Sequence, residues 1–174
     1  MQPSLSSFIR TVPDFPKQGI QFKDITPILQ HPEAVRQAVD ELAELAREAK
    51  VQKVVAVEAR GFWFGPLVAE RLSVGWVPVR KAGKLPAPTT SVSYQLEYGT
   101  DELFIHQDAI APGEVVLVHD DLLASGGTAR AACQLVEACG GVVGQVSFLV
   151  ELGFLAGRDQ LKSYPVRSLI CYDH

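Results

Sequence analysis

Residues 115–128 read VVLVHDDLLASGGT, a stretch that joins an apolar run to two adjacent carboxylates, a loop of small residues and the start of a helical pattern. The β-branched run predicts a buried strand over residues 114–119. Glycines in the loop remove the Cβ atoms that would keep an anion away from backbone N–H groups, and the dipole of the following helix favours negative charge. The stretch therefore indicates a strand–loop–helix unit whose loop has the composition of a phosphate site.

The loop alone has two interpretations. It lacks the Gly-Lys-Ser/Thr of a Walker loop and the Gly-x-Gly-x-x-Gly of a dinucleotide site, so a plain Gly-rich turn with Thr128 as helix cap is one of them. Anion binding is the other, with hydroxyl donors added by Ser125 and Thr128. In that interpretation the phosphate-binding residues are Ala124, Ser125, Gly126, Gly127 and Thr128.

The adjacent acids favour the second interpretation. Asp120 and Asp121 would repel a phosphate that they touched, but they suit the hydroxyls of a sugar that carries the phosphate. They could also help to hold a magnesium ion through water. A solvated strand end is the alternative, and a position between a buried strand and a phosphate loop argues against it.

Strand and helix patterns alternate on both sides of this unit. We expect helices over residues 32–50, 66–72 and 128–139, and buried strands over residues 53–58, 76–80, 114–119, 142–152 and 166–172. This alternation predicts an α/β fold with a mainly parallel sheet, helices on both faces and a ligand beyond the carboxyl ends of the strands. Residues 92–98 alternate between apolar and polar, and with residues 102–106 they predict a hairpin after a loop at 81–90.

Length and composition set outer bounds. The 174 residues suit a single domain spanning 1–174, whose first 30 or so residues, rich in Pro and Gly, predict a loop-rich cap. The net charge of −4 argues against nucleic acid as a partner. We find no signal peptide and no apolar run that could span a bilayer. Three cysteines with no metal-site spacing indicate reduced thiols in a cytosolic protein.

Motifs along nearly the whole chain resemble one family. The stretch VLVHDDLLASGGT is similar to the ribose-phosphate signature of type I phosphoribosyltransferases. Further segments resemble the adenine-specific members of that family, in order and with family-length spacings. They are FPKQGIQFKDITPIL (15–29), EARGFWFG (58–65), VPVRKAGKLP (77–86), YQLEYGTD (94–101), IHQDA (105–109) and Glu151–Leu152.

The resemblance implies a fold, a reaction and partners. The fold would be the type I phosphoribosyltransferase fold, with residues 1–30 as a hood over the base site. The reaction would join adenine to phosphoribosyl pyrophosphate and give AMP and pyrophosphate, a pentosyl transfer in purine salvage. Magnesium would be held through substrate and water rather than by direct protein ligands. A cytoplasmic homodimer that binds neither nucleic acid nor membrane is expected.

For the sugar donor, the resemblance assigns three groups of residues. The loop at 124–128 would hold the 5′-phosphate, and Asp120 and Asp121 would bind the ribose 2′ and 3′ hydroxyls. Pyrophosphate needs positive charge for binding and for departure. The densest basic cluster of the chain would supply that charge across a dimer interface, and one more arginine would contribute to it. These residues are Arg60, Arg80, Lys81 and Lys84.

For the base, the resemblance assigns the hood and the alternating strand. Gln21 would read the amino edge of adenine, Phe22 would stack on the ring, Leu122 would close the opposite face, and Arg60 would hydrogen-bond the base. Adenine N9 loses a proton as the new bond forms, so a carboxylate near the purine can relay it. We assign this catalytic role to Glu97, which with Tyr98 would belong to a mobile loop that excludes water.

Four residues depart from the family pattern, and two alternative functions stay open. Ser125 stands where Thr is commoner, and His119 replaces an apolar residue and is expected to be structural, with a pH effect on the acids as the alternative. Gln18 replaces a Pro and Phe104 a Glu. One alternative function is transfer to hypoxanthine, guanine or orotate. Another is a regulator that only senses phosphoribosyl pyrophosphate, although the chain lacks the basic face of a DNA-binding protein.

Overall fold

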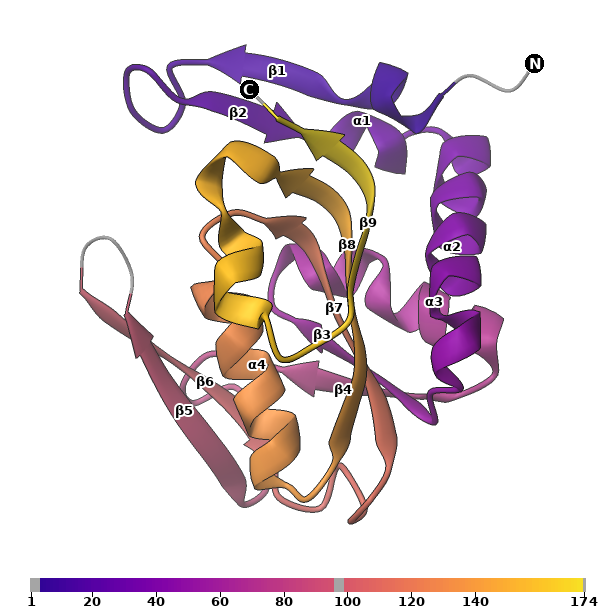
Figure 1. The fold of residues 1–174 in the computed structure, drawn as a ribbon, viewed down its shortest axis with the longest axis vertical. Helices are drawn as coiled ribbons and strands as arrows, with labels where there is room; N and C mark the ends of the chain where they lie inside the picture. The colour runs from indigo at the N-terminus through magenta and orange to yellow at the C-terminus, as the bar shows by residue number, and fades with distance from the viewer. Residues whose placement is uncertain (1–3, 96–98, 174) are drawn as a thin grey trace. The chain divides into compact units, whose positions relative to one another are not determined.

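The computed structural model describes residues 4–95 and 99–173 (Figure 1). Backbone contacts divide the chain into two units, of which the first ends at Glu41 and the second begins at Leu42. The prediction of a single domain therefore stays a prediction, and so does the placement of the first 30 residues over a base site.

The first unit is more regular than its sequence suggested. It holds a 3-10 turn, η1 (Leu5–Phe8), the antiparallel strands β1 (Arg10–Pro13) and β2 (Gln21–Asp24), and the short helix α1 (Thr26–Leu29). An ion pair between Arg10 and Asp24 closes one end of the hairpin, and the rings of Phe15 and Phe22 meet edge to face with centroids 5.1 Å apart. Strands of four residues are too short to show a period, so the sequence predicted only loop here.

Helix α2 (Pro32–Ala46) begins in the first unit and ends in the second, where the 3-10 turn η2 (Arg47–Ala49) leads to the sheet. The sheet contains β3 (Lys53–Val57), β4 (Gly75–Val79), β7 (Val115–Leu123), β8 (Val142–Leu152) and β9 (Val166–Tyr172). All five strands are parallel, in the order β4-β3-β7-β8-β9. This confirms the predicted α/β fold, and each predicted strand is present.

Side chains alternate between the two faces of the sheet. On one face, Val55, Val118 and Phe148 pack in the same core cluster as Leu135 and other residues of α4 (Gly127–Ala138). On the other face, α3 (Gly65–Leu72) approaches β3 so closely that a Cβ added at Gly65 would overlap the Ala56 side chain. Figure 1 shows α3 and α4 on opposite sides of the sheet, which confirms the expectation of helices on both faces.

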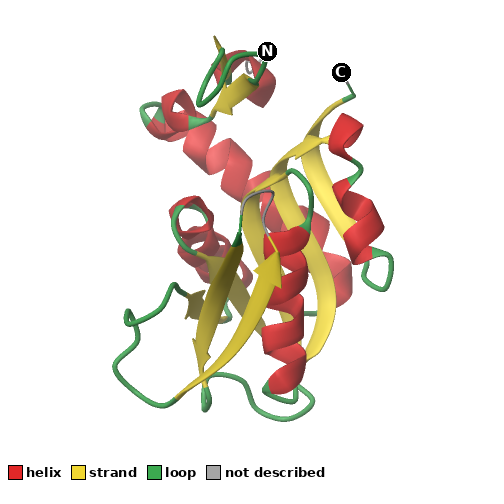
Figure 2. Ribbon diagram, turned by 90° about the vertical axis from the view of Figure 1, so that its left-hand side faces the viewer, coloured by secondary structure: helices red, strands yellow, loops and turns green. Residues whose placement is uncertain are grey.

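A separate hairpin lies beside α4. It is formed by β5 (Thr89–Gln95) and β6 (Thr100–His106), with Tyr94 paired to Asp101 and Gln95 paired to Thr100 (Figure 2). The side chains of Leu103 and Ile105 on β6 pack in the same core cluster as residues of α4. The hairpin was predicted, but β5 begins at Thr89 inside the expected loop and β6 begins at Thr100 rather than at residue 102.

Short 3-10 turns complete the second unit. Turn η3 (Arg60–Trp63) connects β3 to α3, and η4 (Gly153–Leu155) and η5 (Gly157–Leu161) lie between β8 and β9. None of the helices in the described ranges is long and apolar enough to cross a membrane.

Candidate active site

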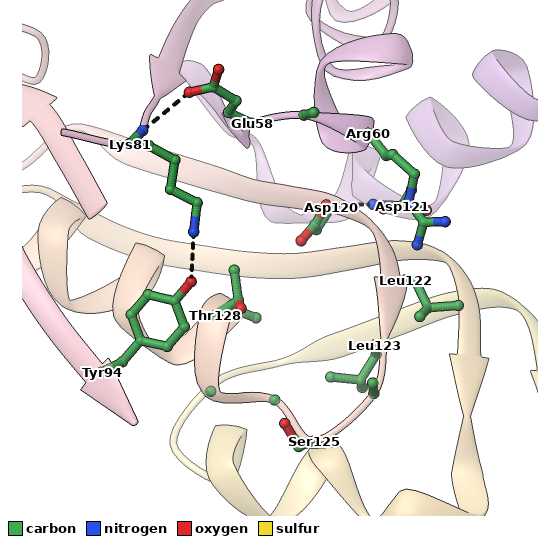
Figure 3. A pocket seen from close by; sticks show the side chains of 15 residues that line it. Glu58, Arg60, Lys81, Tyr94, Asp120, Asp121, Leu122, Leu123, Ser125 and Thr128 are labelled. Carbon is green, nitrogen blue, oxygen red and sulfur yellow. Dashed lines mark hydrogen bonds and ion pairs between the residues drawn. The ribbon is translucent and has the colours of Figure 1, made fainter. Parts of the chain in front are cut away.

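A cavity of about 310 Å³ opens where β3 and β7 end and α4 begins (Figure 3). It lies entirely within the second unit, at the carboxyl ends of two neighbouring parallel strands, the place where ligands bind in open α/β sheets. The residues that line it are Glu58, Ala59, Arg60, Lys81, Tyr94 and residues 120–129. The loop and the acid pair predicted from the sequence therefore line one cavity.

The phosphate loop is shaped by two close backbone approaches. Gly126 has φ +87° and is the N-cap of α4, and a Cβ added there would overlap the carbonyl oxygen of Gly157. A Cβ added at Gly157 would in turn overlap the carbonyl oxygen of Ala124. Only glycine satisfies both the left-handed conformation and this packing. The loop thus turns its small residues and the amino end of α4 toward the cavity, as an anion site requires.

The two carboxylates differ in their partners. Asp121 is buried and forms an ion pair with Arg60, with 3.0 Å between Nε and Oδ2. Asp120 is half-buried, and its Oδ1 accepts a hydrogen bond from the Asp121 N–H at 2.8 Å. Gly61 permits this arrangement because a Cβ there would lie 2.9 Å from Oδ1 of Asp120. The close approach of η3 to β7 therefore brings Arg60 into its ion pair with Asp121.

Both carboxyl groups are harder to ionise than a free aspartate. Burial raises the pKa of Asp120 well above its usual value, and the neighbouring charge of Asp121 raises it further. Burial also raises the pKa of Asp121, although the Arg60 cation opposes that rise. A ligand that brings hydroxyl donors or a cation to this pair would stabilise the ionised forms.

On another side of the cavity, Lys81 and the neighbouring Arg80 each have an anionic partner. Both ends of the Arg80 guanidinium fork reach the Glu58 carboxylate, at 3.0 and 3.3 Å, and the Lys81 N–H donates to the same carboxylate at 3.1 Å. The hydrogen bonds from Arg80 are the main cause that lowers the pKa of Glu58, and burial opposes this effect. The Lys81 ammonium pairs with Asp101 and donates to the Tyr94 hydroxyl at 3.1 Å.

His119 lies directly before the acid pair and is fully buried. Its Nδ1 lies 3.0 Å from Oγ of Ser147 on β8. Burial lowers the pKa of His119 to about 4, so the ring is neutral near pH 7. This geometry agrees with the structural role expected from the sequence.

The remaining predicted site residues divide into four groups. Arg60, Lys81 and Leu122 line the cavity with the loop and acid pair, whereas Arg80 and Lys84 are absent from its lining; the Lys84 carbonyl accepts from Arg80 at 3.2 Å. Gln21 and Phe22 belong to the first unit. Glu97 and Tyr98 lie outside the described residues. The roles assigned to all of these side chains stay predictions.

Sequence reasoning assigned no role to Glu58, Tyr94 or Asp101. Glu58 directly follows a buried strand, which is the same signal that singled out Asp120, so it could have been found. Tyr94 was expected only as a member of the alternating strand, and both Tyr94 and Asp101 belong to the family segment 94–101. Their contact with Lys81 depends on the hairpin register, which the alternating pattern did not reveal.

No group of three or more His, Cys, Asp or Glu side chains in the described part of the chain could enclose a metal ion. Asp120 and Asp121 offer the carboxylate oxygens that magnesium prefers, since the other carboxylate in the cavity lining, Glu58, is already paired with Arg80. The donor set therefore fits an ion that completes its shell with water and substrate oxygens.

Comparisons with known proteins agree with this geometry. Residues 24–168 match the model of the phosphoribosyl transferase domain family. The adenine phosphoribosyltransferase of Christiangramia forsetii is 55% identical over 168 residues, covering 97% of this chain and 98% of the relative. The crystal structure of the Thermoanaerobacter pseudethanolicus adenine phosphoribosyltransferase is 52% identical and superposes with a TM-score of 0.94, covering 97% of this chain and 98% of that one.

A third relative was solved with ligands. The Saccharomyces cerevisiae adenine phosphoribosyltransferase is 41% identical, has a TM-score of 0.89 and covers 94% of this chain and 95% of its own. That crystal structure contains adenine and an imino-altritol bisphosphate.

Proposed function

The chain belongs to the phosphoribosyl transferase family, among the adenine phosphoribosyltransferases, and on that premise we infer that the cavity at the ends of β3 and β7 is where the transfer takes place. The enzyme converts adenine and phosphoribosyl pyrophosphate into AMP and pyrophosphate, and so salvages free adenine. One observation carries the assignment of the cavity: Asp120 and Asp121 lie beside the phosphate loop within a single cavity.

The donor binds along β7 and its loop. Backbone N–H groups of residues 124–128 and the Ser125 and Thr128 hydroxyls hold the 5′-phosphate, because these residues line the cavity at the amino end of α4. Asp120 and Asp121 accept hydrogen bonds from the ribose 2′ and 3′ hydroxyls. Arg60, Lys81, Arg80 and Lys84 supply positive charge for pyrophosphate, with Arg80 and Lys84 acting across a subunit interface.

The chemical step replaces the C1′–oxygen bond to pyrophosphate with a bond from C1′ to adenine N9. Positive charge develops on the sugar while pyrophosphate departs with the bonding electrons, so cations at the leaving group stabilise the transition state. Glu97 takes or relays the N9 proton. Gln21, Phe22, Arg60 and Leu122 hold the base, and closure of the segment with Tyr98 keeps water from the activated sugar.

A magnesium ion fits this site as a partner of the substrate. Two carboxylates whose pKa values are raised by burial gain from a nearby cation, and they are too few to enclose one. Asp120 and Asp121 would hold the ion through water and the ribose hydroxyls. When bound, it would neutralise charge on the departing pyrophosphate.

The proposal extends to the oligomeric state of the enzyme and to its cellular compartment. The enzyme is a homodimer in the cytoplasm, as its family membership and the placement of Arg80 and Lys84 outside the cavity lining suggest. Light scattering of the substrate-free protein tests the dimer, and a fully active monomer would contradict it.

The reaction is tested by pyrophosphate release in the presence of adenine, hypoxanthine or guanine. We expect adenine to be preferred by at least about 100-fold, because a buried site built to read an amino group leaves its own polar groups unpaired with the other bases. Comparable turnover with hypoxanthine or guanine would refute the assignment. Binding of phosphoribosyl pyrophosphate without turnover on any base would indicate a sensor instead.

A matched pair of variants tests the acid pair. Asp121→Asn should weaken donor binding by about 1–3 kcal/mol, the cost of a mismatched buried polar group. Asp108→Asn removes the same charge from an exposed residue outside the cavity lining and should leave donor binding unchanged. Calorimetric titration with phosphoribosyl pyrophosphate measures both affinities. Equal effects of the two substitutions would contradict the assignment of the donor site to β7.

A further inference from the structure

Three side chains at the edge of the cavity form a closed triangle of polar contacts. The Lys81 ammonium pairs with the Asp101 carboxylate and donates to the Tyr94 hydroxyl at 3.1 Å, while that hydroxyl donates to Oδ2 of Asp101 at 3.2 Å. Lys81 and Tyr94 line the cavity, but Asp101 is not part of the lining. The carboxylate therefore reaches the cavity only through the other two side chains.

The fold determines this contact at both ends of Lys81. Its N–H is anchored on Glu58 at 3.1 Å, so the lysine leaves β4 in a defined direction. Tyr94 and Asp101 are cross-strand partners in the β5–β6 hairpin, which places the hydroxyl and the carboxylate on the same side of that hairpin. Figure 3 shows Lys81 extended between Glu58 and Tyr94 along one side of the cavity.

The charges in the triangle are only partly shielded from water. The side chains of Lys81 and Asp101 are 40% and 31% exposed. Hydrogen bonding from Lys81 is the main cause that lowers the pKa of Asp101. Burial works against the charge on Lys81, but its bonds to Asp101 and Tyr94 outweigh burial and raise its pKa. Both groups are thus ionised at neutral pH, and the ammonium already has an anionic partner.

We propose that Asp101 is a positioning residue that competes with the pyrophosphate group for the Lys81 ammonium and so sets how tightly the donor and the product pyrophosphate are held. This inference rests on the proposed function of the cavity. A polyanion in the cavity attracts Lys81 away from Asp101, and the carboxylate left behind repels the polyanion. Both effects weaken binding and favour release of pyrophosphate.

Competition and a merely structural role predict opposite results. If Asp101 only kept the hairpin in place, its removal would loosen Lys81 and weaken pyrophosphate binding. If it competes, Asp101→Asn frees the ammonium and removes a repelling charge, so binding becomes tighter. The amide keeps the size of the side chain, and its oxygen can still accept the Glu102 N–H hydrogen bond that Asp101 Oδ1 accepts at 2.8 Å. Its NH2 group then faces the Tyr94 hydroxyl and can donate to it.

The test is a double-mutant cycle with inorganic pyrophosphate and magnesium as the probe. We expect Asp101→Asn to bind pyrophosphate about two- to fivefold more tightly, the range for a partly exposed ion pair. Lys81→Met should bind it more weakly, and adding Asp101→Asn to Lys81→Met should tighten binding by less than Asp101→Asn does alone, because only the direct repulsion of the polyanion is then relieved. In steady state, Asp101→Asn should lower KM for the donor while the single-turnover rate stays the same.

Two controls keep the result interpretable. Glu102→Gln removes a charge from the next residue of β6, whose side chain is outside the cavity lining, and should leave pyrophosphate affinity unchanged. Asp101→Glu restores the carboxylate and should restore the affinity of the parent enzyme. If Asp101→Asn does not fold, as judged by circular dichroism, Asp101→Ser replaces it in the same cycle, and its tightening of pyrophosphate binding must be smaller without the lysine.

Weaker or equal binding by folded Asp101→Asn would overturn the inference, and so would tightening of the same size in the Lys81→Met background. AMP formation from adenine is measured on the same preparations. If AMP forms but the cycle shows no coupling, the inference alone fails. If no AMP forms, the proposed function fails whatever the cycle shows.

Discussion

The two walls of the cavity hold charge in different ways. The loop wall, residues 120–129, offers backbone N–H groups and hydroxyls from one continuous segment. The ion-pair wall consists of Glu58, Lys81 and Tyr94, with Arg80 and Asp101 behind them, and each of its two cations is already paired with a carboxylate. Neutral backbone donors suit a phosphate that stays bound through the reaction, whereas paired cations suit a group that must arrive and leave.

The difference also concerns rigidity. The loop wall is held by backbone packing, since Gly126 and Gly157 leave no room for a Cβ. The ion-pair wall is held by long side chains, which can change partners without moving the backbone. A substitution that needs backbone space should therefore damage the first wall and spare the second.

The largest expected effect tests this contrast with two glycines. Gly126 and Gly83 both have positive φ, +87° and +70°, but a Cβ at Gly83 meets nothing within 4 Å whereas one at Gly126 overlaps the Gly157 carbonyl. Gly126→Ala combines strain with a clash and should weaken donor binding by about 100-fold or more. Gly83→Ala, in the Lys81–Lys84 loop, should change it by less than about tenfold. Titration calorimetry with phosphoribosyl pyrophosphate measures both, and similar losses would show that the two walls do not differ in this way.

An intermediate effect concerns the strand beneath the loop wall. The folded-state pKa of His119, about 4, lies below its usual value of 6.5, so the folded protein resists protonation of the ring. The resulting stability is fully present above pH 6.5 and is lost as the pH falls toward 4, by about 3 kcal/mol in all. His119→Gln, which can still bond Ser147, should lose less stability across this window. Urea unfolding at several pH values measures the difference; parallel pH profiles would mean that His119 does not titrate as inferred.

The smallest effect separates stability from binding in the acid pair. The folded-state pKa of Asp120 is raised above 3.8, so the stability that its proton contributes is present below pH 3.8 and is lost as the pH rises through the folded-state pKa. Asp120→Asn should therefore raise the melting temperature of the substrate-free enzyme at pH 7, by about 2–4 °C for each 1 kcal/mol gained, while donor binding falls. At pH values where Asp120 is protonated, the gain should disappear.

Asp108→Asn is the control for that measurement, because Asp108 is exposed and its side chain lies outside the cavity lining. It should leave the melting temperature unchanged. A lower melting temperature for Asp120→Asn at pH 7 would show that the carboxylate stabilises the fold rather than straining it.

The two walls were also unequally predictable. Strand β7, its acid pair, the loop and α4 follow one another without interruption, so residue order alone indicated that they lie together and what they could bind. The five parallel strands were predicted because their apolar runs alternate with helical patterns, and the family motifs identified the reaction. Where runs were only four residues long, as in β1 and β2, no period could be recognised.

The ion-pair wall was decided by tertiary structure. Glu58 and Arg80 are 22 residues apart and Lys81 and Asp101 are 20, and no local pattern links them. The parallel register of β3 with β4 brings Val57 opposite Val79, so that Glu58 and Arg80, the residues that follow, meet. The hairpin register then places Asp101 opposite Tyr94 and both beside Lys81. The sequence by itself determined which chemical groups one continuous segment carries, such as the acid pair and the loop donors. Strand register decided which distant charges neutralise each other, because an ion pair forms only between side chains that the folded backbone brings into contact.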